Sequence, residues 1–485
     1  MTRPTATTYP ADRRRRLIYN DDSDQQFTAG PHALTDEQSF IDARTTPAFG
    51  SHVDTYVWCV GNGADPPWGG ERYAIDPLLG SCARATELIV EACHRNRVEV
   101  WGSLRINDLH DAQRNRLEDT HEPLKATHPE LLVGDIADRQ YGKERIERTL
   151  WAALNFEHAQ VRQYRLDYVA RNAAAHDFDG YELDFSRFPW SFPQGRERQL
   201  APLMTGFVRG VRGILDDIAD RRGRPYTLVA HVMDTPELSL NLGQDVERWA
   251  AEGLVDVVVA GMGFCPFTID LGMWKKFGAR YDLPVYPSLN TRPFGLLYRD
   301  RLDRQTLLPE FLRGVATWWW REQVDGIYLF NLFSHAEMDK HMDRSDVYAP
   351  LLELGDPEAL DGRQKVYAVD MNNGMFNQGV MTLPLPCVLD IHERRLPLCV
   401  SDEARDPQAR FALHIWTQGG AGDKLLARLN HHLLKPERAG DHHTVEVPGG
   451  LLKPGRNELT LFCGTELAST ASPSVAREIL LSVTY

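Results

Sequence analysis

Short hydrophobic runs recur along the first two thirds of the chain, and most of them are followed by a segment of helical periodicity. Each run combines β-branched, aromatic and aliphatic residues and ends at polar or turn-forming residues, which is typical of a short strand. This pattern predicts eight strands, at 17–20, 55–60, 98–104, 180–185, 227–232, 255–260, 284–289 and 326–330.

The segments between these runs repeat their apolar residues with the 3.6-residue period of an amphipathic helix. The clearest stripe runs from Leu200 to Ile218, and shorter ones lie at 85–93, 161–169 and 308–319. Alternating strands and helices favour a parallel sheet, and eight such units favour a closed barrel. A doubly wound sheet is the alternative, but no Gly-x-Gly-x-x-Gly follows the first run. We therefore predict the α/β class, with a (β/α)8 TIM barrel over residues 1–350.

The pattern changes after about residue 350, where short alternating runs follow one another without a strong helical stripe. Examples lie at 411–415, 444–447 and 458–461, the last of them after a turn built from Pro454 and Gly455. Short strands separated by turn residues are typical of an antiparallel sandwich. We predict a linker at 351–365 and a β-sandwich accessory domain at 366–485.

Composition and charge narrow the class of protein. A chain of 485 residues with 42% hydrophobic and 25% charged residues is typical of a globular protein with two or three domains. A formal net charge of −14 disfavours nucleic acid as a partner, because binding to phosphates requires a basic face. The basic run Arg13–Arg16 precedes the first strand, and we interpret it as a solvated lead-in rather than a binding or targeting patch.

No apolar stretch is long enough to span a bilayer, and residues 1–11 are polar without the apolar core of a secretory signal. We therefore expect a cytoplasmic protein that does not bind a membrane. The seven cysteines are odd in number and scattered, without a CxxC or a Cys/His cluster. This favours buried, reduced thiols over a zinc site or a disulfide framework, and we expect no metal and no cofactor.

The fourth predicted strand carries two acidic residues on one of its faces. Side chains alternate along a strand, so Glu182 and Asp184 share one face while Tyr181 and Leu183 share the other. If the apolar face meets the helices, both carboxylates point into the barrel near the carboxyl ends of the strands, where barrel enzymes hold their catalytic groups. The alternative for Glu182 is a structural acid, because Arg105 on the same face of the third strand could lie beside it and neutralise it.

The motif Asp179-Gly-Tyr-Glu-Leu-Asp184-Phe-Ser-Arg187-Phe-Pro189 resembles the end of the fourth strand in bacterial glycosyl hydrolases described as family 10-like. Two further segments, 155–158 and 103–111, are similar to segments of the same group, and the resemblance spans about 16–335. It implies a barrel that hydrolyses glycosidic bonds. True family 10 xylanases use glutamates that end the fourth and the seventh strands. The seventh strand here ends at Asn290 without an acid, so that mechanism is not carried over.

A glycosidase with two catalytic acids needs a partner for Asp184. We favour Asp184 as the nucleophile or base, with Asp234 or Glu182 as the acid. Asp234 follows the fifth strand, while Glu237 and the aspartates at 21, 22 and 24 are further sources of a carboxylate. Pairing with Arg105 would lower the pKa of Glu182 and make it a poor proton donor, which weakly favours Asp234.

Polar and aromatic side chains near the strand ends suit sugar recognition, because sugars present hydroxyl groups and apolar ring faces. Trp190 is a candidate for stacking against a sugar ring. We expect the three consecutive tryptophans at 318–320 to pack against the barrel instead. The predicted substrate-binding residues are Asn20, Asp22, Arg105, Asn107, Asp108, His110, Asn155, Arg187, Trp190, His231 and Asn331.

Two other functions stay open at this point. Asn107, Asp108, His110, Asp111, Glu182 and Asp184 could surround a divalent cation in a metal-dependent lyase or isomerase. The barrel could also bind glycan without cleaving it, and the C-terminal domain could bind glycan or act as a stabilising lid. The pattern does not determine the sugar, the linkage, the stereochemical outcome or the oligomeric state.

Overall fold

The structure is a computed structural model that describes residues 15–22, 36–60, 85–109, 112, 123–142, 145–290, 304–332, 344–371, 383–401, 406–419, 425–463 and 474–485. His110, Asp111 and Asp24 lie outside the described residues. The chain divides into two compact units. The first comprises Met1–Met262, Asp270–Ser288 and Asp325–Glu337, and the second comprises Gly263–Ile269, Leu289–Val324 and Met338–Tyr485. The predicted boundaries at 350 and 365 stay a prediction.

Eight parallel strands close into a barrel in the order of the sequence, with β1 paired to both β2 and β8. Every strand that the hydrophobic runs predict is present, so the (β/α)8 fold is confirmed. The strands are β1 (Leu17–Asp21), β2 (Val53–Val60), β3 (Glu99–Arg105), β4 (Gly180–Asp184), β5 (Thr227–Val232), β6 (Val257–Ala260), β7 (Val285–Asn290) and β8 (Ile327–Phe330).

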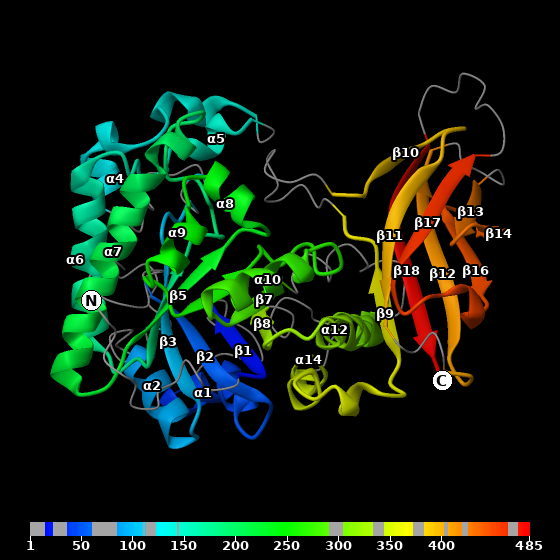
Figure 1. Cartoon of the computed structure of the whole chain (residues 1–485), viewed down its shortest axis with the longest axis horizontal. Helices are drawn as coiled ribbons and strands as arrows, with labels where there is room; N and C mark the ends of the chain where they lie inside the picture. The colour runs from blue at the N-terminus through cyan, green and yellow to red at the C-terminus, as the bar shows by residue number, and fades with distance from the viewer. Residues whose placement is uncertain are drawn as a thin grey trace. The chain divides into compact units, whose positions relative to one another are not determined.

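The predicted helical stripes also form helices, and Figure 1 shows α6 and α7 side by side along the barrel. The stripe of α7 buries Met204, Val208 and Leu215, and Gly210 allows Leu166 of α6 to approach closely. The described helices are α1 (Glu37–Arg44), α2 (Ala85–Arg95), α4 (Pro123–Thr127), α5 (Glu147–Leu150), α6 (Ala159–Ala175), α7 (Glu197–Arg222), α8 (Pro236–Asn241), α9 (Val246–Ala251), α10 (Leu271–Tyr281), α12 (Arg304–Arg321) and α14 (Arg344–Tyr348). Among the described residues, no helix is long and apolar enough to cross a membrane.

The interior of the barrel is filled by side chains from alternate positions of its strands. Trp101 of β3 lies in this core, and a Cβ on the facing Gly180 would come within 2.5 Å of its ring. A buried ion pair lies beside it, because Nε and Nη2 of Arg15 donate to Glu99 at 2.7 and 2.9 Å. The prediction that the basic run is solvated is therefore wrong for Arg15, which is fully buried. The sequence around Arg15 does not show this, because its acidic partner Glu99 lies on β3 and comes close only when the barrel folds.

The second unit contains two antiparallel sheets, and the predicted C-terminal β-sandwich is confirmed. One sheet has the order β10-β18-β12-β16-β15, with β9 also paired to β18, and the other has the order β11-β17-β13-β14. Figure 1 shows these strands from yellow to red. They are β9 (Lys365–Ala368), β10 (Cys387–Leu389), β11 (Arg394–Val400), β12 (Arg410–Gln418), β13 (Leu425–Leu429), β14 (His432–Leu434), β15 (Glu437–Ala439), β16 (His442–Val447), β17 (Gly455–Cys463) and β18 (Ser474–Thr484).

Candidate active site

Asp184 is the last residue of β4 and lies at the carboxyl end of the barrel strands. Its Oδ1 accepts three hydrogen bonds of 2.9 Å, from the backbone N–H and the hydroxyl of Ser186 and from the backbone N–H of Arg187. In the described part of the chain, Oδ2 accepts none. The turn after β4 therefore holds the carboxyl group by one oxygen and leaves the other available for chemistry.

His231 of β5 is paired in register with Asp184. Its Nε2 lies 2.9 Å from the carbonyl oxygen of Gly261 and donates to it in the tautomer that this contact requires. Burial lowers the pKa of His231, so the ring is neutral and Nδ1 carries a lone pair. Nδ1 lies 3.8 Å from Oδ1 of Asp184, and the ring packs 5.0 Å from that of Tyr328. Asp184 thus has a neutral imidazole as its neighbour.

Glu182 lies two residues before Asp184 on the same inward face and is fully buried. Its Oε1 accepts hydrogen bonds from Ser103 at 2.6 Å and from Tyr328 at 3.1 Å. Burial, and then the charge of Asp184, raise the pKa of Glu182 to about 8. This raised pKa favours the protonated form of Glu182 at neutral pH.

The alternative in which Arg105 pairs with Glu182 is not found. The register of β3 and β4 places Ser103 opposite Glu182. Arg105 lies opposite Asp184, two residues closer to the carboxyl ends of the strands. There Arg105 donates to Asp22 at 3.0 Å and to Asp108 at 3.2 Å. A shift of two residues along the strand thus changes which acid the guanidinium neutralises.

Asp22, immediately after β1, joins this cluster of buried charges. Its Oδ2 also accepts a 2.7 Å hydrogen bond from Asn331, the residue after β8, which has a left-handed φ of 58°. Burial alone would raise the pKa of Asp22, but the positive charges of Arg105, Arg187 and Arg44 outweigh it and lower that pKa. Asp22 is therefore ionised.

Arg187 lies near the same charges and is itself buried. Its guanidinium lies 5.3 Å from the ring of Phe188 and 5.9 Å from that of Phe330. Burial, reinforced by the positive charge of Arg105, lowers the pKa of Arg187 to about 10. The arginine remains a cation at neutral pH. Its own backbone N–H is one of the three donors that hold Asp184.

Asp234 follows β5 and is also buried. Its Oδ2 accepts a long, 3.4 Å hydrogen bond from the backbone N–H of Met262, and its own carbonyl accepts a bond from the indole of Trp274. Burial raises the pKa of Asp234 to about 6. A desolvated carboxyl group of this kind can retain its proton close to neutral pH.

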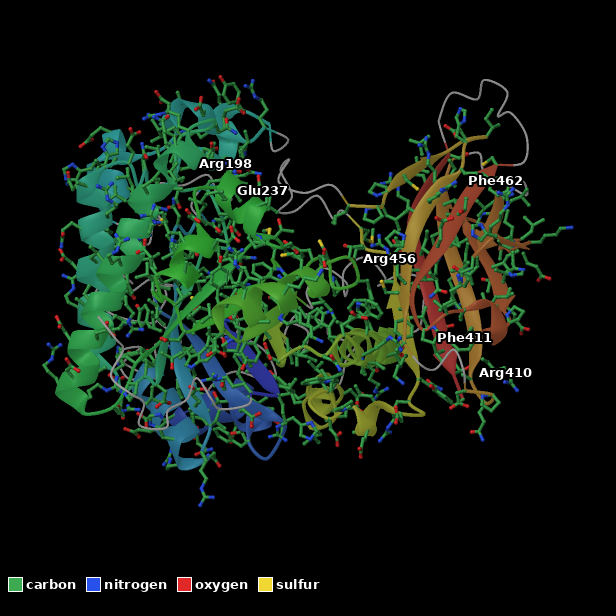
Figure 2. All side chains as sticks on the ribbon, in the orientation of Figure 1. Arg198, Glu237, Arg410, Phe411, Arg456 and Phe462 are labelled. Atoms are coloured by element: carbon green, nitrogen blue, oxygen red, sulfur yellow. The ribbon has the colours of Figure 1, made fainter. Side chains whose placement is uncertain are left out.

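The other predicted residues have more varied surroundings. The amide of Asn107 bonds to the backbone of Leu154 in both directions and to the carbonyl of Trp190, whose own side chain is 7% exposed. Oδ1 of Asn155 accepts the backbone N–H of Glu157. Asn20 of β1 lies against the phenol of Tyr328. Glu237, an alternative acid, is exposed and forms an ion pair with Arg198, and Figure 2 labels both residues.

The sequence pattern did not predict a role in this site for three of its polar residues. Ser103 and Tyr328 donate to Glu182, and Ser186 donates twice to Asp184. The inward position of Ser103 was already visible in the alternation of β3. A hydroxyl on an inward face indicates a nearby hydrogen-bond partner, because a buried polar group needs one.

The described members of the alternative metal set bond to different partners. Asn107 bonds to backbone groups, Asp108 to Arg105, and Glu182 to two hydroxyl groups. Among the residues that the structure describes, no group of three or more His, Cys, Asp or Glu residues could hold a metal ion. His110 and Asp111, the remaining candidates, lie outside them.

Solved structures with a similar fold include several glycoside hydrolases. An Anoxybacillus α-amylase has a TM-score of 0.42 and 13% identity, with 94% of this chain and 99% of that chain covered. An α-amylase of Geobacillus thermoleovorans complexed with acarbose has a TM-score of 0.42 and 15% identity, with 93% and 99% covered.

A family 36 α-galactosidase of Geobacillus stearothermophilus has a TM-score of 0.38 and 10% identity, with 98% of this chain and 56% of that chain covered. These similarities carry no argument about the activity of this chain. No protein-family model and no curated protein matches the sequence.

Proposed function

We propose that the protein is a glycoside hydrolase that cleaves an oligo- or polysaccharide with two carboxyl groups. The observation that carries the proposal is a pair of buried acids, Asp184 and Asp234, at the carboxyl ends of neighbouring strands. Oδ1 of Asp184 is held by three donors, and the pKa of Asp234 is raised to about 6 by burial. Such a difference in surroundings is what separates a nucleophile or base from a general acid.

In this mechanism Asp184 acts through Oδ2 on the anomeric carbon or on a water, and Asp234 protonates the departing oxygen. The charged, amide and imidazole groups beside them are donors and acceptors for sugar hydroxyls, and Trp190 and His110 complete the proposed set. Those groups are Asn20, Asp22, Arg105, Asp108, Arg187, His231 and Asn331. Asn107 and Asn155 support the loops after β3 and before α6 through their backbone bonds.

The resemblance to family 10-like hydrolases supports the same reaction, and that membership is part of the proposal. A cytoplasmic location likewise stays a prediction.

The test is turnover on a panel of oligosaccharides and aryl glycosides by the wild-type protein and two variants. Asp184→Asn should lose at least about a hundredfold in kcat/KM on every substrate, because the group that acts on the sugar carbon is gone. Asp234→Asn should lose about 10²–10⁴-fold on substrates with poor leaving groups, and much less on dinitrophenyl glycosides, which need no proton.

Glu237→Gln, at an exposed carboxyl group in α8, is the matched control and should keep wild-type turnover. A wild-type protein that cleaves no glycoside of the panel, or an Asp184→Asn variant with full turnover, would contradict the proposal. Circular dichroism of each variant establishes that a loss of turnover is not a loss of fold.

A further inference from the structure

Glu182 lies at the centre of a buried hydrogen-bond network that the two-acid mechanism does not use. Glu182 is fully buried. Ser103 and Tyr328 both donate to Oε1, whereas Oε2 is buried without a hydrogen-bond partner among the described residues. An ionised carboxylate needs donors on both oxygens when it is removed from water, so this arrangement disfavours a charge on Glu182.

Among the described residues no cation forms an ion pair with Glu182, although the charge of Arg105 acts to lower its pKa. Arg105, the basic residue on the adjacent strand, donates to Asp22 and Asp108. Burial lowers the pKa of His231 and keeps its ring neutral, outweighing the charge of Asp184 and the hydrogen bond to Gly261, which both raise that pKa. Burial also raises the pKa of Tyr328, which remains a hydroxyl donor. The titratable and charged groups that surround Glu182 are thus Arg105 on β3, Asp184 on β4, His231 on β5 and Tyr328 on β8.

Asp184 is the nearest negative charge along the strand. Two carboxylates on one inward face of a buried strand repel each other strongly, because little water screens them. A proton on Glu182 removes this repulsion. Asp184, with three donors on Oδ1, is the better site for the charge, and Glu182, with one oxygen unpaired, is the better site for the proton.

We propose that Glu182 is a positioning residue that stays protonated. The inward face of β4 then carries one carboxylate, that of Asp184, instead of two. Its hydrogen bonds to Ser103 and Tyr328 fix β4 against β3 and β8, and thereby fix the angle at which Asp184 leaves the strand. The proposal rests on the proposed function for the task of Asp184, but the proton itself can be detected without turnover.

The pH dependence of stability is the first test. The pKa of Glu182 is raised from 4.5 to about 8, so between these values the unfolded chain loses the proton and the folded chain keeps it. Stability from this group therefore falls as pH rises through that interval. Glu182→Gln carries no such proton, so its melting temperature minus that of the wild type should rise steadily from about pH 5 to about pH 8.

Glu237→Gln is the control here too, and its difference from the wild type should stay small and constant over the same range. A difference for Glu182→Gln that stays flat or falls with pH would overturn the proposal, because it would mean that Glu182 is ionised in the folded protein.

Infrared titration of the wild type is the second test and does not require that Glu182→Gln folds. The carbonyl band of a neutral carboxylic acid should persist at pH 7 and disappear near pH 8. Ser103→Ala removes a donor that favours the ionised form, so it should move the disappearance of this band to higher pH. Absence of the band at pH 7 would overturn the proposal. If the wild type cleaves no glycoside, the proposed function fails while the thermal and infrared results still decide the state of Glu182.

Discussion

Asp184 ends β4 and Asp234 follows the neighbouring strand β5, but their carboxyl groups meet different surroundings. Three donors at 2.9 Å reach Oδ1 of Asp184, whereas the bond from Met262 to Asp234 is 3.4 Å long. The pKa of Asp234 rises to about 6 because burial removes water that its charged form would need. At the scale of single residues, the site therefore separates a held carboxylate from a group that can carry a proton.

This separation predicts how activity depends on pH. The protonated form of Asp234 is the proton donor, and that form is lost as pH rises through its pKa of about 6. We expect kcat/KM on a glycoside with a poor leaving group to fall as pH rises through this value in the free enzyme. The measurement is a pH–rate profile of the wild type and of Asp234→Asn. A fall that persists unchanged in the variant would assign the acid to another group.

At the scale of the element, the first residues of β4 and the residue before it stabilise the barrel, and the last residues of the strand carry the acids. Asp179, just before the strand, bonds to His94 and to the backbone N–H of Val100 at 2.9 Å each, and also to Arg224. Gly180 leaves room for the ring of Trp101. The functional groups appear only from Glu182 onward. The motif therefore stabilises the barrel through its first residues and presents its acids through its last.

Packing of β4 against β3 predicts a cost for a single added methyl group. In Gly180→Ala the Cβ would lie 2.5 Å from Cδ1 of Trp101, so we expect a loss of about 1–3 kcal/mol in the free energy of unfolding. Gly206→Ala in α7 is the matched control, because nothing lies within 4 Å of its Cβ. This change should stabilise the helix by about 0.5–1 kcal/mol. Urea unfolding measures both, and equal effects of the two substitutions would contradict this account.

At the scale of the whole molecule, residues far apart in the sequence close the barrel and stabilise its interior. Arg15, just before β1, donates to Glu99 of β3, which also accepts a hydrogen bond from Thr55 of β2. Asn331, after the last strand, bonds to Asp22, after the first. Both contacts connect the beginning of the barrel with elements that the chain reaches much later.

The buried pair of Arg15 and Glu99 predicts a non-additive effect on stability. Glu99→Leu alone leaves a buried cation without its partner and should cost about 3–5 kcal/mol. The double variant Arg15→Met/Glu99→Leu removes both charges and should be more stable than Glu99→Leu alone. A double-mutant cycle by urea unfolding measures the coupling. Additive losses from the two single variants would contradict it.

Much of the fold follows from local pattern. The eight hydrophobic runs, the stripe of α7 and the alternating C-terminal strands each fall on an observed element, because the period of side chains along an element is a local property. The same alternation placed Glu182 and Asp184 on the inward face of β4, and Ser103 and Arg105 on the inward face of β3.

Local pattern did not determine which inward groups meet. Arg105 bonds to Asp22 instead of Glu182, and Arg15 is buried instead of solvated. Both outcomes depend on strand register and on partners tens of residues away. The sequence by itself therefore determined the elements, their faces and the acids of β4. Only the tertiary structure decided which acid is neutralised and which keeps its proton, because burial and charge pairing arise when the barrel closes.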